Sequence, residues 1–197
     1  IDLRKVFGLK NIHLYFGMGI GCQLFFSGLL TMLRPLFKTL FAYYDETISS
    51  IFITDTVIAG VYIVILAPVI EELMLRGILF NRLRQALPFY AANLIQAVLF
   101  GIYHWDIIQG LYAFGIGLIL GYIYEKTKTL RAPVFVHMIV NGSGFLIQVS
   151  DIGKYITSVW MPVVIGGGLL FAGFINFAKT INNIDIRKDD EKADIIN

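Results

Sequence analysis

Long apolar stretches separated by short polar ones dominate the hydropathy pattern of the chain. About 20 apolar residues in a row are enough to cross a bilayer as a helix. The stretches of this kind, with approximate bounds, are 12–33, 51–85, 89–105, 107–124, 132–149 and 155–177. The pattern predicts an all-α fold, a polytopic transmembrane helix bundle of about six spans, with a polar link at 34–50.

The composition supports a membrane location. Hydrophobic residues make up 57% of the chain and charged residues 15%, whereas soluble domains carry about 25% charged residues. The lipid bilayer is therefore an expected partner, and the net charge of +2 gives no reason to expect nucleic acid. The length suits one transmembrane helical domain, residues 1–178, followed by a polar cytoplasmic tail, 179–197, predicted to be disordered.

The basic residues predict how the chain is oriented. If six spans alternate in direction, the side that holds both termini carries twelve Lys and Arg residues. The opposite side carries three, namely Arg34, Lys38 and Lys154. Because basic residues concentrate in cytoplasmic loops, we predict a multi-pass protein of the cell membrane with both termini in the cytoplasm.

Two adjacent carboxylates and an arginine interrupt the second apolar stretch, at Glu71, Glu72 and Arg76. A charge near the bilayer centre costs from about 3 to above 10 kcal/mol, so such groups are kept when they pair or face an internal cavity. Glu72 and Arg76 have i,i+4 spacing in the favourable order, and we expect them to pair. Glu71 lies about 100° further round the helix and is expected to lack a local partner. Pro68 should free the carbonyl of Val64.

Two later stretches carry polar residues at helical spacing. Phe100 and His104 are i,i+4 in the third stretch, and so are His137 and Asn141 in the fifth, so each pair shares one helix face. Because lipid-facing placement would be costly, we expect three helices to turn these groups toward a polar intramembrane cavity. In straight helices His104 falls near the outer end of its span. A tilted third helix, a deeper start, or a link at Asp106 that re-enters the bilayer would each correct this.

These side chains suit hydrolysis of a peptide bond without a serine or cysteine nucleophile. A carboxylate near a neutral histidine can take a proton from water, and a second histidine with an asparagine can stabilise an oxyanion. A glutamate with two histidines is also a catalytic zinc set, which makes Glu71, His104 and His137 the metal candidates. No essential cofactor is expected, and zinc is the alternative.

The order of the motifs resembles a known family. The three motifs are Glu71-Glu72-x-x-x-Arg76, Phe100-x-x-x-His104 and His137-x-x-x-Asn141. They resemble those of the CAAX protease and bacteriocin-processing family, also called CPBP or Abi. Its members are intramembrane proteases related to the type II CAAX prenyl endopeptidase. The resemblance covers about residues 55–150, which would be the catalytic core.

The resemblance implies a role for each motif. Glu71 would activate water together with His104, and His137 with Asn141 would stabilise the oxyanion. The second glutamate and the arginine of the first motif would support the site. Members of the family have been labelled metalloproteases, but a glutamate–histidine mechanism needs no metal. The implied partner is a peptide or protein substrate at the membrane.

Two other functions use the same features. A bacteriocin immunity or peptide-binding protein would keep the fold without hydrolysis. A small proton-coupled transporter would use buried Glu and His as proton relays, although no clear internal repeat of hydropathy supports it. The sequence leaves the oligomeric state open. It also leaves open whether a substrate is a prenylated C-terminus, a bacteriocin leader or a signalling propeptide.

Overall fold

The computed structural model describes residues 12–51, 56–150 and 158–196. Every regular element within these ranges is a helix, so the predicted all-α fold is confirmed. Five of the helices are long and apolar enough to cross a membrane, and the chain is a multi-pass membrane protein. The remaining predicted span corresponds to α7 (Phe89–Tyr103), which is apolar but shorter than the other five, at 15 residues.

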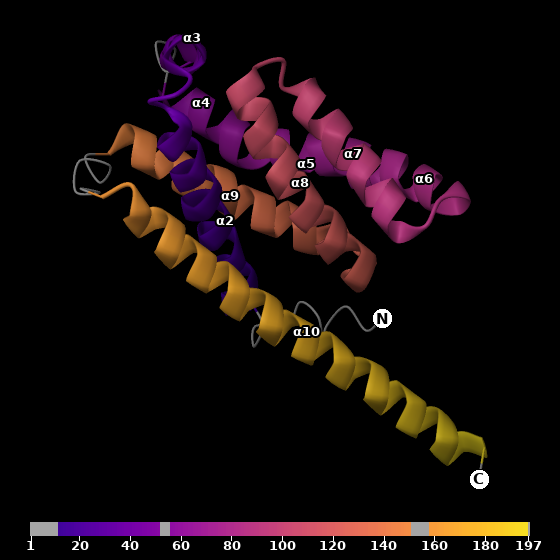
Figure 1. Ribbon diagram of the computed structural model, residues 1–197. Coiled ribbons are helices and arrows are strands. Elements are labelled where there is room, and N and C mark those ends of the chain that lie inside the picture. Colours follow the sequence, from indigo (N-terminus) through magenta and orange to yellow (C-terminus); the bar gives the residue numbers. More distant parts are fainter. Residues whose placement is uncertain (1–11, 52–55, 151–157, 197) are drawn as a thin grey trace.

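Helices α2 (Ile12–Leu33) and α10 (Trp160–Ile196) pack along each other (Figure 1). Glycine makes this close approach possible, because a methyl group on Gly21 would lie 2.9 Å from the backbone nitrogen of Leu170. Small residues at helix crossings are typical of membrane bundles. The helix α10 continues through 179–196, where a disordered tail was predicted. The predicted start of this span, 155–157, lies outside the described residues.

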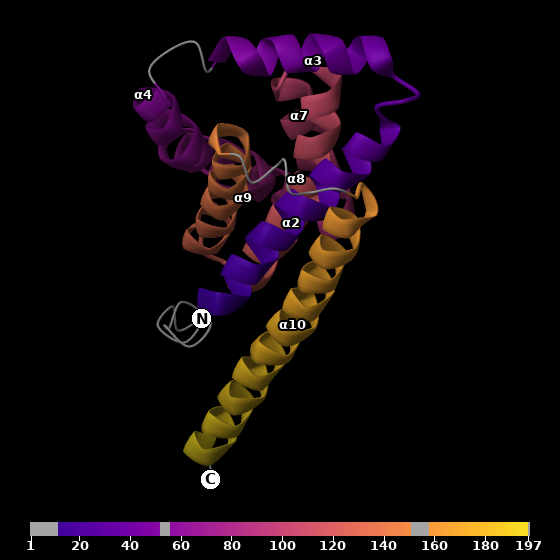
Figure 2. The same ribbon diagram turned by 90° about the vertical axis from the view of Figure 1, so that its left-hand side faces the viewer.

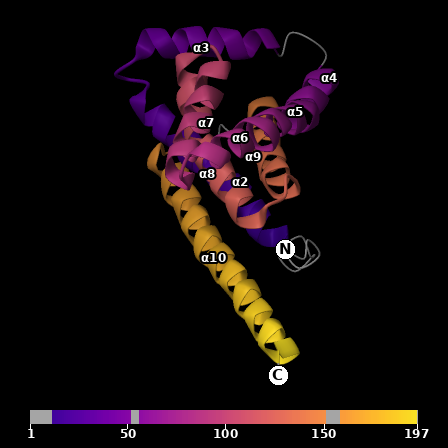
Figure 3. The same ribbon diagram turned by 90° about the vertical axis from the view of Figure 1, so that its right-hand side faces the viewer.

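The segment predicted as a polar link contains a helix, α3 (Lys38–Ile51). It lies across the end of the bundle at which α7 and α8 (Ile107–Thr127) are joined (Figures 2 and 3), and it packs against α8. Arg34, just before α3, donates two hydrogen bonds to the Asp45 carboxylate, of 2.7 and 2.8 Å. This hydrogen bonding lowers the pKa of the Asp45 carboxyl below its ordinary value. The pairing fixes α3 to the end of α2.

The second predicted span is one helical run of 31 residues, Thr56–Ala86. Its parts in order are α4 (Thr56–Val61), η1 (Tyr62–Leu66), α5 (Ala67–Glu72), η2 (Leu73–Phe80) and α6 (Asn81–Ala86), where η marks a π-helix. The Ala67 N–H bonds to the Tyr62 carbonyl, the five-residue step of a π-helix. In that register the carbonyl left without a backbone donor by Pro68 is that of Ile63, whereas an α-helical register would give that of Val64.

A tight turn joins α7 to α8. His104 caps the C-terminus of α7, Trp105 adopts a positive φ of 57°, and the Asp106 side chain accepts a hydrogen bond from the Gln109 N–H at the start of α8. Helix α9 (Arg131–Val149) follows α8 and packs against α2, α8, α5 and η1. The resulting contacts bring α5, η2, α7, α8 and α9 together. This part of the bundle carries the predicted site residues.

The main apolar core lies among α2, α8, α9 and α10, on the other side of α8 and α9 from η2. Met18, Leu120, Val136 and Phe177 are among its fully buried members. Helices α8 and α9 therefore have one face in the core and one face toward the polar residues of η2 and α7. This arrangement gives the site a rigid apolar support.

Candidate active site

The predicted ion pair between Glu72 and Arg76 is confirmed. Both side chains are fully buried, and Nη1 of Arg76 lies 2.7 Å from Oε1 of Glu72. The guanidinium makes two further contacts outside its own helix. Its Nη2 donates to the Gly117 carbonyl of α8 at 2.9 Å, and its Cζ lies 5.2 Å from the centroid of the Phe100 ring. A hydrogen bond to α8 and a ring from α7 thus help to hold a charge that would otherwise be costly to bury.

His137 of α9 lies between the two carboxylates. Its Nδ1 is 2.9 Å from Oε1 of Glu72, and its Nε2 is 3.7 Å from Oε2 of Glu71. An ionised carboxylate only accepts hydrogen bonds, so Nδ1 carries the proton and donates it to Glu72. Nε2 is left facing Glu71. The histidine is therefore oriented by one carboxylate and presented to the other.

Glu71 differs from Glu72 in its surroundings. Its side chain is 12% exposed and borders a cavity of about 110 Å³ between η2 and α7, together with Met74, Leu75, Leu99 and Tyr103. Within 4 Å, its oppositely charged partner among the described residues is His137 rather than a residue of its own helix. Glu72 is committed to two partners, and Glu71 is the carboxylate that meets open space.

His104 is half-buried at the end of α7. Its Nδ1 lies 2.9 Å from the Phe100 carbonyl, which fixes the proton on Nδ1 because a carbonyl has none to donate. In the neutral ring, Nε2 is then an acceptor. The rings of His104 and His137 lie 4.8 and 5.7 Å from that of Phe100. The two histidines thus pack against one aromatic ring, and Tyr103, next to His104, lines the cavity of Glu71.

Asn141 bonds to the backbone of η1. Its Nδ2 donates to the Ile63 carbonyl at 2.9 Å. This is the carbonyl that Pro68 leaves without a backbone donor in the π-helical register. One N–H of the Asn141 amide therefore completes the hydrogen bonding of η1, and this amide couples α9 to the helix that carries the glutamates.

The metal alternative does not fit this arrangement. Within the described ranges, no group of three or more His, Cys, Asp or Glu side chains is placed to hold a metal ion, and this includes Glu71, His104 and His137. We therefore derive no reaction step through a metal.

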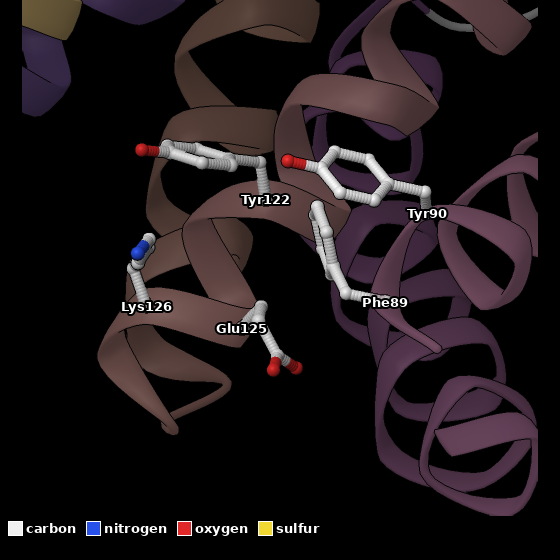
Figure 4. Close-up of a pocket in the computed structure, with 5 residues that line it drawn as sticks. All are labelled: Phe89, Tyr90, Tyr122, Glu125 and Lys126. Atoms are coloured by element: carbon white, nitrogen blue, oxygen red, sulfur yellow. The ribbon is translucent and has the colours of Figure 1, made fainter. Parts of the chain in front are cut away.

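A larger cavity lies away from Glu71 and Glu72. It measures about 390 Å³, and its lining comes from the start of α7 and the last turns of α8 (Figure 4), with none of the predicted site residues. Glu125 at its edge pairs with Arg84 at 3.0 Å and Lys128 at 2.9 Å. Cavity size alone would thus have pointed away from the predicted site residues.

Two buried amides near the site were not predicted. Asn93 and Gln96 of α7 are 7% and 0% exposed, and Gln96 Nε2 donates to the same Gly117 carbonyl that Arg76 uses. The sequence carries a signal for them, since two amides one turn apart interrupt an otherwise apolar stretch. Phe100 was identified as a motif position, but its contacts with Arg76 and both histidines required the structure.

The fold and the site together define a class of protein. It is a bundle of apolar membrane helices in which carboxylates, an arginine and histidines from three helices meet inside the protein. Residues 53–143 match the family model of the type II CAAX prenyl endopeptidase Rce1-like proteins, a range that includes all six predicted site residues. This match covers a little under half of the chain, which over that range is similar to the CAAX protease and bacteriocin-processing family.

Two relatives show the extent of the similarity. The chain is 32% identical over 105 residues to YdiL of Bacillus subtilis (strain 168), a candidate membrane peptidase, over 52% of the chain and 43% of the relative. It is 29% identical over 93 residues to the membrane-embedded CAAX protease MroQ of Staphylococcus aureus (strain USA300), over 44% of the chain and 38% of the relative. The chain thus spans less than half the length of these relatives. No solved structure matches the chain significantly.

Proposed function

We propose that the chain is an intramembrane endopeptidase that hydrolyses a peptide bond of a membrane-associated peptide or protein. The observation that carries this proposal is the difference in hydrogen bonding between the two adjacent carboxylates. Glu72 is bonded to Arg76 and His137, whereas Glu71 borders the cavity beside Nε2 of His137. The match of residues 53–143 to the Rce1-like family model supports the reaction class.

Glu71 acts as the general base in this proposal. A water molecule in the cavity gives one proton to the Glu71 carboxylate and donates a hydrogen bond to Nε2 of His104, which orients it. Nε2 is an acceptor because the Phe100 carbonyl holds the ring proton on Nδ1. The water oxygen forms a bond to the carbonyl carbon of the substrate, and the π electron pair moves onto the carbonyl oxygen.

His137 stabilises the resulting oxyanion. The cluster contains the carboxylates of Glu71 and Glu72 and the guanidinium of Arg76, so a protonated His137 ring brings the net charge of the cluster to zero. Nδ1–H then stays on Glu72 while Nε2–H points toward the cavity edge and donates to the oxyanion. When the carbon–nitrogen bond breaks, Glu71 returns its proton to the leaving amine, which yields a carboxylic acid and an amine. Asn141 contributes by holding η1 through the Ile63 carbonyl.

The substrate reaches the site from the bilayer side. The cavity wall is apolar apart from Glu71 and Tyr103, and Met74 and Leu99 are themselves 51% and 42% exposed on the outside of the helix bundle. A volume of about 110 Å³ suits one aliphatic side chain next to the scissile bond. The residue accommodated there is therefore expected to be apolar, such as leucine or methionine.

The proposed orientation places both termini in the cytoplasm, because the loop after α8 is basic. The chain has one cysteine, Cys22, which is buried, so single-cysteine labelling in a Cys22→Ala background can test this orientation. A cysteine at Lys128 should react only after the membrane is permeabilised, and one at Ser49 should react in intact cells. The reverse pattern would invert the topology.

Hydrolysis can be tested without knowing the natural substrate. The purified protein is incubated with an extract of bacterial membrane proteins in water enriched in oxygen-18, and mass spectrometry identifies new C-termini that carry the heavy oxygen. We expect such termini with the wild type and a loss of about 100-fold or more with Glu71→Gln. Glu46→Gln, the same change on the exposed face of α3, is the matched control and should cleave normally.

The same experiment with a chelator tests whether cleavage needs zinc. Wild-type cleavage should continue after treatment with EDTA. Cleavage by Glu71→Gln at the wild-type rate would refute the role of Glu71, and loss of wild-type cleavage with EDTA that returns on adding zinc would refute the metal-independent mechanism. Absence of heavy-oxygen termini with a folded wild type would refute hydrolysis of the proteins in that extract.

A further inference from the structure

Two amides on α7 are buried where a membrane helix is expected to be apolar. Asn93 Nδ2 donates to the Leu118 carbonyl at 3.0 Å, and Gln96 Nε2 donates to the Gly117 carbonyl at 2.9 Å. The amides also bond to each other, with Gln96 Nε2 lying 2.8 Å from Asn93 Oδ1. Burying an amide is costly unless its polar atoms are bonded. Here both amide nitrogens donate to the backbone of α8, whereas Gln96 Oε1 is buried without a partner among the described residues. The donated bonds hold the pair against the backbone of α8.

Glycine lets the amides reach that backbone. A methyl group at Gly121 would overlap Asn93 Oδ1 and lie 2.7 Å from Gln96 Nε2, and one at Gly117 would lie 3.2 Å from atoms of Ala97 and Phe100. Any larger residue at Gly121 would therefore displace both side chains. The small-residue pattern of α8 is thus used to admit polar groups of α7 as well as to bring the helices close together.

The Gly117 carbonyl connects these amides to the candidate site. Arg76 Nη2 and Gln96 Nε2 both donate to this oxygen at 2.9 Å, so the two nitrogen atoms can be no further apart than twice that distance. Arg76 in turn holds Glu72, and Glu72 holds Nδ1 of His137. A continuous chain of hydrogen bonds therefore runs from Gln96 on α7, through the backbone of α8 and through η2, to His137 on α9.

We propose that Asn93 and Gln96 are positioning residues that fix the Gly117 carbonyl and thereby Arg76, Glu72 and the ring of His137. The pair does not touch the cavity of Glu71, so it acts through Arg76 rather than on a substrate. The consequence for catalysis rests on the proposed peptidase function. The structural consequence, an altered environment of His137 when the amides are lost, does not depend on it.

The first test measures His137 directly. The chain has three histidines, so protein labelled with carbon-13 and nitrogen-15 histidine gives three ring systems, which His104→Gln and His137→Gln variants assign by NMR. Gln96→Met keeps the side-chain length and removes the donor, and it should shift the ring signals of His137 while those of His13, which is exposed on α2, stay in place. Gln148→Met, an exposed position on α9, is the matched control and should shift neither.

Two more variants test the effect of the amides on His137. Gly121→Ala leaves both amides intact but displaces them, and it should shift the His137 signals as well. Gln96→Asn keeps the amide and shortens the side chain by one methylene, so it carries the test if Gln96→Met does not fold. Unchanged His137 signals in folded Gln96→Met, or in folded Gln96→Asn where that variant replaces it, would overturn the proposal.

The second test measures cleavage of one peptide identified in the heavy-oxygen experiment. Gln96→Met should lower kcat about tenfold with KM unchanged, the effect of losing one net hydrogen bond in the support of the site. In an Arg76→Lys background the same change should lower kcat by less than twofold, because the link is already broken. A shifted His137 signal with an unchanged kcat would overturn the catalytic part of the proposal. If the wild type cleaves nothing, the NMR result still decides the positioning part.

Discussion

The buried pair of Glu72 and Arg76 allows a quantitative test of how the site is held together. Arg76→Met replaces a fully buried guanidinium with an apolar side chain and leaves the Glu72 carboxylate with one donor, Nδ1 of His137. Breaking a buried ion pair by removing one partner costs about 3–5 kcal/mol. The unpaired Glu72 carboxylate can instead take up a proton, which costs about 4 kcal/mol at pH 7. The loss of stability therefore cannot exceed about this amount. We expect Arg76→Met to lower the free energy of unfolding by about 3–4 kcal/mol.

A second substitution should recover most of this loss. Glu72→Gln in the Arg76→Met background removes the unpaired charge, and the amide oxygen still accepts a hydrogen bond from His137. The Gly117 carbonyl keeps its donor from Gln96. The remaining deficit is one weaker hydrogen bond, about 1–2 kcal/mol. The double variant should therefore be more stable than Arg76→Met by about 2 kcal/mol, yet have no detectable cleavage activity.

Equilibrium unfolding in mixed micelles of dodecyl maltoside and sodium dodecyl sulfate, followed by circular dichroism, measures these differences. The Arg34→Met variant is the matched control, since its partner Asp45 is half-exposed and a pair of this kind contributes at most about 1 kcal/mol. If the Glu72→Gln change makes Arg76→Met less stable instead of more stable, the buried charge is not the source of the cost and the reasoning is refuted.

Two further pairs of substitutions test the helix contacts. Asn141→Val should lower the free energy of unfolding by about 1–3 kcal/mol, because the carbonyl that Pro68 leaves without a backbone donor then has no partner. Adding Pro68→Ala should restore about 1 kcal/mol. No recovery in the unfolding assay would contradict the π-helical register. Gly166→Ala should cost about 1–3 kcal/mol, because its methyl group would lie 2.8 Å from the carbonyl oxygen of Gly21. Gly168→Ala meets open space and should be neutral or stabilising by up to about 1 kcal/mol; equal melting temperatures for the two variants would contradict the contact.

The sequence was sufficient for the features that follow from the geometry of a single α-helix. Apolar length predicted membrane helices, and the i,i+4 spacing of Glu72 and Arg76 predicted their ion pair, because both follow from the rise and turn of a single helix. The order of three motifs indicated the family. The placement of Pro68 predicted a freed carbonyl, but the register of the surrounding helix decided which one, and a π-helix is not evident from residue spacing.

Tertiary structure decided everything that depends on how helices face one another. It placed His137 between two carboxylates, directed Asn141 to the backbone of η1, and brought Gln96 to the carbonyl that Arg76 uses. It also showed that α7 ends at Tyr103, with His104 as the C-cap residue. Helix periodicity gives the direction of a side chain around its own axis, whereas the partner across an interface depends on the crossing of two helices, which distant packing contacts determine.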